Sequence, residues 1–357
     1  MKRIFNQTRE SIALLAGLVI FSIVLAFWVL PSRLPAARYG AVMIYDPVGN
    51  RAFLFGGRSE GLFGMRYFND LWVFDPLTQD WMPITPARRP PGRLSPAMVY
   101  DPVRHQIILF GGYDGHERLA DTWTYKISEN QWEEITPAIS PPARSDTGML
   151  YDNENGVLIL FGGMCQEDQR VLCNDTWIFS PDTNTWVEMQ PLSPPMISYG
   201  HALVLDPVHQ QAVLWGGHQT MIKNGQATEG GYRDRLWRYD YVENTWQEWI
   251  HTYKPPARYW QMAVCDTHNN QLVLFGGNGF HSYYNDTWFY HLDGDTWERV
   301  SPDHAPSPRV NAAMTYDPAN QIIILFGGLD EDYKTLQDTW IFEVKDNVSE
   351  WRLVEAH

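Results

Sequence analysis

The sequence has few positive charges for its size. Its 357 residues include 27 Lys and Arg against 42 Asp and Glu, which gives a formal net charge of −15 at pH 7. Nucleic-acid-binding proteins need basic stripes that neutralise phosphates, and anionic lipid surfaces attract basic segments. The charge balance therefore argues against nucleic acid as a partner and against docking on an anionic lipid surface.

The sequence also lacks the usual signatures of catalysis and metal binding. We find no Ser–His–Asp arrangement, phosphate-binding loop or cluster of metal ligands at a recognisable spacing. The acidic run at 330–332 is open to two interpretations, a set of Ca²⁺ ligands or a solvated loop tip, and we favour the second. The sequence therefore assigns no catalytic residue, no metal site and no cofactor.

Cysteine is scarce, with three residues in the whole chain. Cys165 and Cys173 lie in one predicted loop, and in an oxidising compartment they would close a disulfide across it. Two free surface thiols are the alternative. Cys265 falls within a predicted strand, where we expect a buried thiol.

Only one long apolar run is present, at residues 12–30, and it contains no charged side chain. A helix of this length crosses a hydrocarbon layer of ~30 Å. Basic residues before a span predict that this end faces the cytoplasm, and here they are Lys2, Arg3 and Arg9. We therefore predict a short cytoplasmic N-terminus at 1–11, a single-pass transmembrane signal anchor at 12–30 and a linker at 31–37.

This anchor would hold the rest of the chain on the extracytoplasmic side of the cell membrane. A cleavable signal peptide is the alternative, and its removal would leave a secreted or periplasmic protein. The apolar core of a signal peptide is usually ~7–15 residues long. The longer run in this chain favours the uncleaved anchor.

The most informative feature of the sequence is a repeated diglycine. Phe precedes the diglycine in five repeats, and Trp precedes it in the fourth. In the second repeat the preceding residues, 105–110, form a nearly continuous apolar run, typical of a strand covered on both faces. The glycines that end it permit positive φ. The diglycines recur on average about every 54 residues. They are Gly56-Gly57, Gly111-Gly112, Gly162-Gly163, Gly216-Gly217, Gly276-Gly277 and Gly327-Gly328.

Two tryptophans follow each diglycine. They are nine residues apart in five repeats and eleven apart in the last. This spacing predicts a hairpin of fixed length whose tryptophans stack between adjacent repeats. The pairs are Trp72 and Trp81, Trp123 and Trp132, Trp177 and Trp186, Trp237 and Trp246, Trp288 and Trp297, and Trp340 and Trp351.

Together, the diglycines, the tryptophan pairs and the Asp–Trp strands resemble the repeats of the kelch family over about nine-tenths of the chain. The resemblance implies an all-β fold, a six-bladed kelch-type β-propeller at 38–357 with four antiparallel strands per blade around a central channel. We expect the last repeat to supply its own fourth strand at 351–355, so that ring closure borrows no strand from the other terminus. We also expect one propeller per chain, without obligate oligomerisation.

In five repeats an Arg stands eight residues before the Asp that ends the first strand. Blade symmetry predicts that these arginines lie near the channel mouth. In kelch domains that bind acidic peptides, Arg at this position contributes to the pocket, and guanidinium groups pair well with carboxylates. Hydrogen bonding to carbonyls of the neighbouring blade is the alternative. The candidate ligand-binding arginines are Arg38, Arg93, Arg144, Arg258 and Arg309.

An Asp stands shortly before the first Trp in the same five repeats, and we expect it to cap backbone amides of its loop. These residues are Asp70, Asp121, Asp175, Asp286 and Asp338. The fourth repeat departs from both rules, with Ser198 at the Arg position and Arg235 inserted between Asp234 and Leu236. A ligand-binding sector and simple sequence drift both explain this departure, and we favour the first.

In kelch proteins with known ligands, the loops after the second strands contribute to the binding face. Here these loops differ in length and sequence while the strands repeat, and such variation on a fixed frame is typical of recognition. Aromatic side chains amid polar ones suit sugar or peptide contacts; packing beneath their own loops is the alternative. The candidate ligand-binding residues are Tyr67, Tyr113, His116, His218, Tyr232, His281, Tyr283 and Tyr333.

We therefore predict a membrane-tethered, extracytoplasmic binding or scaffold module that contacts a protein or a glycan through its loop face. The alternative is an extracytoplasmic carbohydrate-active enzyme, a sugar epimerase, isomerase or lyase, because the bacterial N-acetylneuraminate epimerase is also a six-bladed kelch protein. An epimerase needs an acid and a base that face one carbon, and no spacing singles out such a pair. A cytoplasmic adaptor is a third interpretation, which a stable disulfide between Cys165 and Cys173 would exclude.

Overall fold

The computed structural model describes residues 34–61, 64–165, 173–196, 199–223, 226–345 and 348–355. The chain divides into two compact units, Met1–Ala36 and Ala37–His357. The predicted cytoplasmic segment 1–11 and membrane span 12–30 lie outside the described residues. Within the described ranges, no helix is long and apolar enough to cross a membrane.

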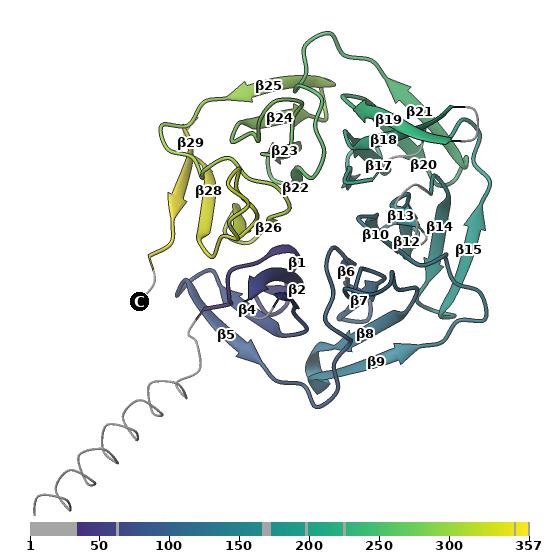
Figure 1. The fold of residues 1–357 in the computed structure, drawn as a ribbon, viewed down its shortest axis with the longest axis vertical. Coiled ribbons are helices and arrows are strands. Elements are labelled where there is room, and N and C mark those ends of the chain that lie inside the picture. Colours follow the sequence, from purple (N-terminus) through teal and green to yellow (C-terminus); the bar gives the residue numbers. More distant parts are fainter. Residues whose placement is uncertain are drawn as a thin grey trace, which may run out of the picture. The chain divides into compact units, whose positions relative to one another are not determined.

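The second unit is a six-bladed β-propeller, as predicted. In its described residues, six sheets with four consecutive antiparallel strands each surround a central axis (Figure 1). The first three blades contain β1 (Tyr39–Asp46), β2 (Arg51–Gly61), β4 (Leu71–Asp75) and β5 (Asp80–Ile84); β6 (Ala97–Asp101), β7 (Gln106–Phe110), β8 (Thr122–Lys126) and β9 (Gln131–Ile135); and β11 (Gly148–Asp152), β12 (Val157–Phe161), β14 (Thr176–Ser180) and β15 (Thr185–Met189).

The last three blades repeat this order. They contain β16 (Ala202–Asp206), β17 (Gln211–Trp215), β20 (Leu236–Asp240) and β21 (Thr245–Trp249); β22 (Met262–Asp266), β23 (Gln271–Phe275), β24 (Thr287–His291) and β25 (Thr296–Val300); and β26 (Ala313–Asp317), β27 (Ile322–Phe326), β28 (Thr339–Lys345) and β29 (Val348–Leu353). Blade 6 thus takes all four strands from the C-terminal segment, which confirms the prediction that no strand is borrowed from the other end.

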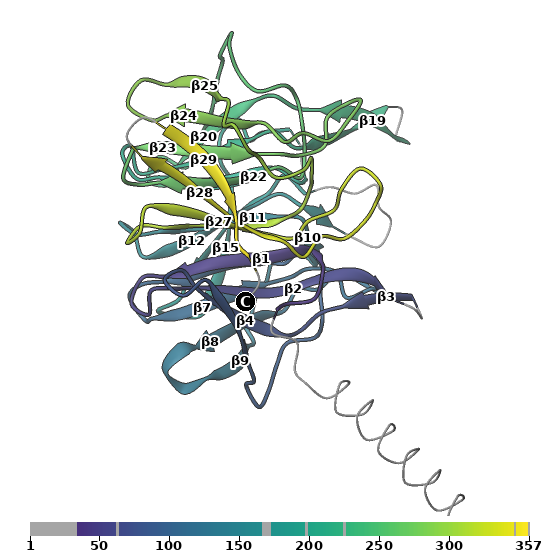
Figure 2. The ribbon, with the colours of Figure 1, turned by 90° about the vertical axis from the view of Figure 1, so that its left-hand side faces the viewer.

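Short additional strands lie in the loops that follow the second strands and, for β10, in the segment that leads into blade 3. They are β3 (Gly64–Tyr67) on β2, the pair β10 (Arg144–Ser145) and β13 (Met164–Cys165), and the hairpin β18 (His218–Lys223) and β19 (Gln226–Tyr232). Figure 2 shows β3 and β19 projecting on the same side of the propeller. We call this side the loop face. A single 3₁₀ turn, η1 (Ile127–Glu129), lies on the opposite face between β8 and β9.

Neighbouring backbone approaches the diglycines closely; in blade 1 the pair lies within β2, and in the other blades it directly follows the second strand. Gly56 and Gly57 have φ of 75° and 89°, a left-handed region that suits glycine. The Gly57 amide donates a hydrogen bond of 2.8 Å to the Arg93 carbonyl of the next blade. A Cβ at Gly56 would lie 2.9 Å from that same oxygen. The diglycine therefore provides the room for the chain to cross from one blade to the next.

The second tryptophan of each repeat joins adjacent blades, as predicted from its spacing. Trp186 of blade 3 packs on Phe110 of blade 2, with ring centroids 5.1 Å apart. Its indole N–H donates a 3.1 Å hydrogen bond to the Thr122 hydroxyl of blade 2. The same Trp-to-Thr bond recurs at three other interfaces, from Trp81 to Thr339, from Trp246 to Thr176 and from Trp351 to Thr287.

Two interfaces lack this hydrogen bond for a simple reason. Leu71 and Leu236 occupy the positions that Thr fills elsewhere in the repeats. The indole N–H groups of Trp132 and Trp297, which belong to the next blades, accordingly have no hydrogen-bond partner among the described residues. Packing continues without the bond, since Trp132 still lies against Phe55 with centroids 5.4 Å apart.

Candidate functional site

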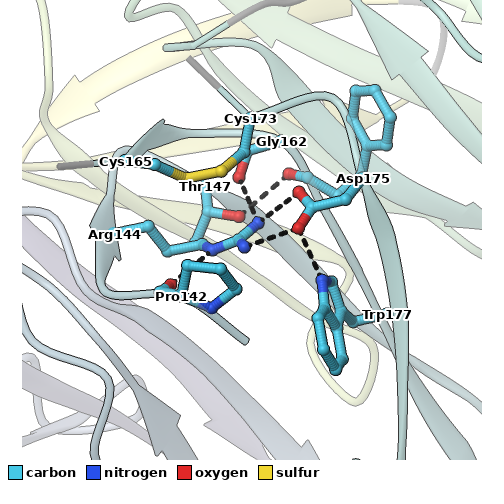
Figure 3. Close-up of a disulfide and its surroundings, with 9 residues drawn as sticks. Pro142, Arg144, Thr147, Gly162, Cys165, Cys173, Asp175 and Trp177 are labelled. Atoms are coloured by element: carbon cyan, nitrogen blue, oxygen red, sulfur yellow. Dashed lines mark hydrogen bonds and ion pairs between the residues drawn. A yellow bond between two sulfur atoms is a disulfide. The ribbon is translucent and has the colours of Figure 1, made fainter. Parts of the chain in front are cut away.

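The five candidate arginines are buried inside the blades. Arg144 donates from Nη1 and Nη2 to the two carboxylate oxygens of Asp175, at 2.7 and 2.8 Å, and from Nη1 to the Gly162 carbonyl at 3.0 Å (Figure 3). The Trp177 indole donates to the same carboxylate at 2.6 Å. We call this unit of Arg, Asp, glycine carbonyl and Trp the arginine clasp.

The clasp recurs in all the blades that carry the arginine. The other Arg–Asp pairs are Arg38–Asp70, Arg93–Asp121, Arg258–Asp286 and Arg309–Asp338. The five arginines are at most 1% exposed, so they line no open surface of the channel mouth, where we predicted a ligand. Bidentate pairing and a glycine carbonyl of the same blade use the guanidinium donors instead.

The capping predicted for the aspartates is only part of their role: Asp70, Asp175 and Asp338 accept a hydrogen bond from their own backbone amide. Their other partners, which were not predicted, are a guanidinium and an indole. Burial alone would raise the pKa of Asp175, but the hydrogen bond and the charge of Arg144 outweigh burial and hold that pKa below its ordinary value. The same balance lowers the pKa of Asp70, Asp286 and Asp338. These carboxylates are therefore ionised structural partners.

A closed ring of backbone hydrogen bonds surrounds the channel just inside the loop face. One residue of each blade donates its N–H to the carbonyl of the ring residue in the preceding blade, at 2.7 to 3.3 Å, and the first blade donates to the sixth. All the members have positive φ, which turns the chain from the incoming loop into the first strand. The ring residues are Gly40, Ser95, Asp146, Gly200, Trp260 and Asn311.

The channel contains three cavities of about 160, 210 and 510 Å³. The smallest is lined by the ring residues, together with His201 and Gln261, and we call it the channel mouth. The largest is lined by Tyr45, Pro102 and equivalent residues near the opposite face. The backbone ring therefore separates the loop-face surface from a wider, more apolar interior.

Asp146 is the acidic group of the channel mouth. Its carboxylate accepts hydrogen bonds from the Trp260 indole at 3.0 Å and from the Ser145 hydroxyl at 2.8 Å. Burial raises the pKa of Asp146, although Ser145, Ser95, Trp260 and the charge of Arg118 act in the opposite direction.

An aromatic cluster adjoins the ring over blades 4 and 5. Tyr199 and Tyr259 each precede a ring residue, and their ring centroids lie 5.9 Å apart. His218 lies between them, at 5.2 Å from Tyr199 and 5.4 Å from Tyr259. Tyr232 completes the cluster, 5.3 Å from Tyr259. Burial, with the charge of Asp146 added, raises the pKa of Tyr199 to about 12, so the Tyr199 hydroxyl is a neutral donor at physiological pH.

A second cluster lies over blades 1 and 2. Arg58 stacks on Tyr39 with its guanidinium carbon 4.9 Å from the ring centroid, and its Nη1 donates to the Tyr67 hydroxyl at 3.3 Å. Tyr113 packs edge-on against Tyr67 at 5.9 Å. Asp146 also contributes to a raised pKa of Tyr39, after burial and the opposing effect of Arg58. Both clusters therefore approach the same carboxylate.

The structure brings some predicted loop residues together and keeps others apart. Tyr67 and Tyr113 belong to one cluster, and His218 and Tyr232 to the other. Tyr283 is half-buried, and its amide donates to Glu331 at 2.7 Å. Three further predicted residues, His116, His281 and Tyr333, are exposed on loops.

Sequence reasoning missed the residues that form the channel mouth. Asp146, Tyr199, Tyr259 and Trp260 all stand one or two positions after the Arg of the repeat, or after the Ser198 that replaces it. The available signal was variation at these two positions among the repeats, although Tyr recurs three times at the first and Gly twice at the second. Within the described residues, no group of His, Cys, Asp and Glu is arranged to hold a metal ion.

Cys165 and Cys173 form a disulfide, with Cα atoms 5.8 Å apart (Figure 3). Cys165 pairs with Arg144 in the short ladder of β10 and β13, so the disulfide fixes the strand that leads into Asp146. Cys265 is a free, half-buried thiol that lines the widest cavity. Burial, with nearby Asp206 and Asp266, raises the pKa of the Cys265 thiol to about 12, which makes it unreactive as a nucleophile.

Comparison with known proteins places these features in context. The chain is 21% identical over 346 residues to Mei4-dependent protein 6 of Schizosaccharomyces pombe, covering 87% of this chain and 48% of that protein. It is 27% identical over 265 residues to the F-box/kelch-repeat protein At1g51550 of Arabidopsis thaliana, covering 68% and 52%. The chain thus spans about half the length of these curated relatives.

A solved structure of YjhT shares the fold, with a TM-score of 0.69 and 18% identity over 90% of this chain and 99% of that one. The family model described as the KLHDC2/KLHL20/DRC7 Kelch-repeats domain matches residues 27–217 and 200–357. With the diglycines, the inter-blade tryptophans and the four-stranded blades, these matches show that the chain belongs to the kelch-repeat family.

Proposed function

We propose that this protein is a membrane-tethered binding module that recognises a protein segment at the channel mouth of its loop face. The observation that carries the proposal is the convergence of two aromatic clusters on the half-buried carboxylate of Asp146. Tyrosine and tryptophan supply a large contact area and a polar tip. Kelch propellers are suited to protein binding, and one relative combines such repeats with an F-box in its name.

The geometry also suggests how a ligand would bind. The backbone ring narrows the channel, so a segment enters the mouth from the loop face and stops there. Arg58 would hydrogen-bond to an acceptor on one side, whereas Asp146 would accept from a donor in the centre. A peptide backbone or a glycan offers both kinds of group, and glycan binding is the variant of the proposal in which a sugar ring stacks on Tyr259.

Site-specific photo-crosslinking in cells tests the proposal. A benzophenone amino acid at Phe280, which is 73% exposed on the loop face, should crosslink to a specific partner. The same probe at Val103, 71% exposed on the opposite face, is the matched control. A partner captured at position 280 and lost in a Tyr232→Ala, Tyr259→Ala variant supports the proposal; equal capture at both positions contradicts it.

One observation favours a second candidate, a carbohydrate-active enzyme. Asp146 has a raised pKa and shares the channel mouth with His201, and an acid beside a second titratable group is the minimum for epimerisation. NMR of a panel of free sugars with the full-length protein would detect exchange or interconversion. Activity that disappears in Asp146→Asn would favour the enzyme, and its absence would leave the binding module.

The location outside the cytoplasm is part of the proposal. It is supported by the apolar run at 12–30 and by the disulfide between Cys165 and Cys173, which oxidising compartments favour. Retention in carbonate-washed membranes would support the anchor. Protease digestion of the propeller in intact cells would support its extracytoplasmic side, and protection from protease would contradict it.

A further inference from the structure

The fourth blade lacks both charged members of the arginine clasp. Ser198 stands at the sequence position of the arginine, and Arg235 stands where the other repeats place the aspartate. Gly216 and Trp237 retain their clasp positions. Arg235 instead contacts the Glu248 carboxylate on β21 through Nη1. The two replacements occur in the same blade, so the charge pair has been lost as a unit.

A cavity of about 140 Å³ lies in this region of blade 4. Its apolar walls include Leu214, Trp237 and Met196, and its polar walls include Gln219, Arg233 and Arg235. We call it the blade 4 pocket. Met196 is 64% exposed at its rim, which offers an apolar contact next to the opening. The pocket is separate from the channel mouth, whose lining residues it does not share.

Gln219 gives independent evidence that the pocket takes a ligand. Its side chain is 3% exposed, and its Oε1 has no hydrogen-bond partner among the described residues. A buried amide oxygen without a partner loses its hydration without replacement. A ligand that brings an N–H donor to this atom would restore the missing bond.

The charged groups of the pocket indicate what else the ligand carries. Arg233 and Arg235 supply several N–H donors in planar groups that suit a carboxylate, and Glu248 uses only part of the donor set of Arg235. A peptide residue with an acidic side chain provides a carboxylate for the arginines and a backbone N–H for Gln219. An inorganic anion such as sulfate provides a negatively charged acceptor for the arginines. It has no N–H donor for Gln219.

We propose that the blade 4 pocket is a docking site for an acidic residue of a protein partner, flanked by an apolar residue that covers Met196. The site goes beyond the binding proposed at the channel mouth and does not depend on it. The net charge of −15 repels acidic partners at long range, but repulsion between exposed charges is screened beyond about 8 Å at physiological salt. Recognition of the acidic residue therefore depends on the nearby Arg233 and Arg235.

Fluorine NMR of the full-length protein labelled with 5-fluorotryptophan tests this site. The resonance of Trp237 is assigned with Trp237→Phe. We expect the probe N-acetyl-Leu-Glu-amide to shift this resonance saturably, and its isostere N-acetyl-Leu-Gln-amide to bind about tenfold more weakly, as expected for loss of a charge-assisted hydrogen bond. No shift with the Glu probe, or equal shifts with both probes, would overturn the proposal.

Two variants separate binding from folding. The double variant Ser198→Arg, Arg235→Asp rebuilds the clasp, so it should match or exceed the parent in thermal stability and no longer bind the Glu probe. Arg233→Gln should weaken binding about tenfold, whereas Arg88→Gln, a distant exposed arginine, should bind like the parent. Unchanged affinity in the rebuilt variant or in Arg233→Gln would contradict the site.

Discussion

The Trp81 indole N–H donates a 2.9 Å hydrogen bond to the Thr339 hydroxyl, across 258 residues of sequence. Trp81 lies in blade 1 and Thr339 in blade 6, and the Trp81 ring also packs on Phe326 of blade 6 with centroids 5.1 Å apart. The two ends of the repeat array are thus joined by the same contact that joins consecutive blades elsewhere. No strand is shared between the ends, so ring closure combines this side-chain contact with backbone hydrogen bonds, such as the 2.8 Å bond from the Gly40 amide to the Asn311 carbonyl.

Thr339→Val should weaken this closure. The substitution keeps the side-chain volume and leaves the buried indole N–H without an acceptor, which costs about 1–3 kcal/mol. The free energy of unfolding from urea titration measures the effect. Thr183→Val on an exposed turn, as a control, should change it by less than about 0.5 kcal/mol. A Thr339→Val variant as stable as the parent would show that the hydrogen bond contributes nothing to closure.

Trp132→Phe should destabilise the protein less than Trp186→Phe. Both substitutions remove similar buried ring area at equivalent interfaces, but only Trp186 donates to a Thr hydroxyl, Thr122, which would be left unsatisfied. We expect the difference to be about 1 kcal/mol. Parallel urea titrations provide the comparison. Equal losses would mean that these interfaces are stabilised by packing alone.

Asp175→Asn should strongly destabilise the third blade. It leaves the buried guanidinium of Arg144 without its charged partner, and breaking one side of a buried pair typically costs about 3–5 kcal/mol. The exposed pair of Arg88 and Glu134 is the control, since Arg88→Gln should cost less than about 1 kcal/mol. Thermal unfolding of both variants distinguishes a structural clasp from an incidental contact.

The clasps also predict a loss of stability in acid. The pKa values of Asp70, Asp175, Asp286 and Asp338 are lowered in the folded state. Their contribution is therefore present above the unfolded pKa of about 3.9 and is lost as pH falls through the lower folded values. Unfolding free energy should decline below about pH 5. The unfolding free energy of the Asp175→Asn variant should decline less steeply with falling pH than that of the parent. An identical slope in the two proteins would show that Asp175 does not contribute to the acid sensitivity.

The contribution of Asp146 to stability should have the opposite pH dependence. Its pKa is raised in the folded state, so its ionisation destabilises the fold as pH rises from about 4 through the folded pKa. The stability of Asp146→Asn relative to the parent should therefore increase over this range. Thermal unfolding between pH 4 and pH 8 measures it. A difference that is independent of pH would show that Asp146 titrates normally.

The architecture could be predicted from sequence because its determinants repeat. Each repeat has a glycine pair, a Trp pair and a turn Asp at the same positions. The repeats can therefore be expected to fold alike and to pack around one axis, although no contact between them is known from the sequence. The direction of the arginine side chains could not be read in the same way. Whether Arg38 points into the channel or into its blade depends on Asp70, which lies 32 residues away in the sequence. Their joint loss in the fourth repeat, at Ser198 and Arg235, was the sequence evidence that they form a pair.

The channel mouth escaped prediction because its geometry is set by backbone conformation. Ser95, Asp146, Trp260 and Asn311 have positive φ without being glycine, and no local sequence pattern marks such residues. Their side chains are brought together only after six blades have closed. Asp146 and Trp260 lie 114 residues apart and meet in a hydrogen bond that crosses the top of blade 4.

The ring of backbone hydrogen bonds is continuous around the channel and resists its expansion. Outward movement of any one blade stretches the hydrogen bonds on both sides of it, so tangential load is shared around the whole circumference. The ring of hydrogen bonds therefore opposes widening of the channel mouth. Any ligand that enters the mouth would be selected by size against this rim, where the Trp260 indole packs over Gly200 and is held by its hydrogen bond to Asp146.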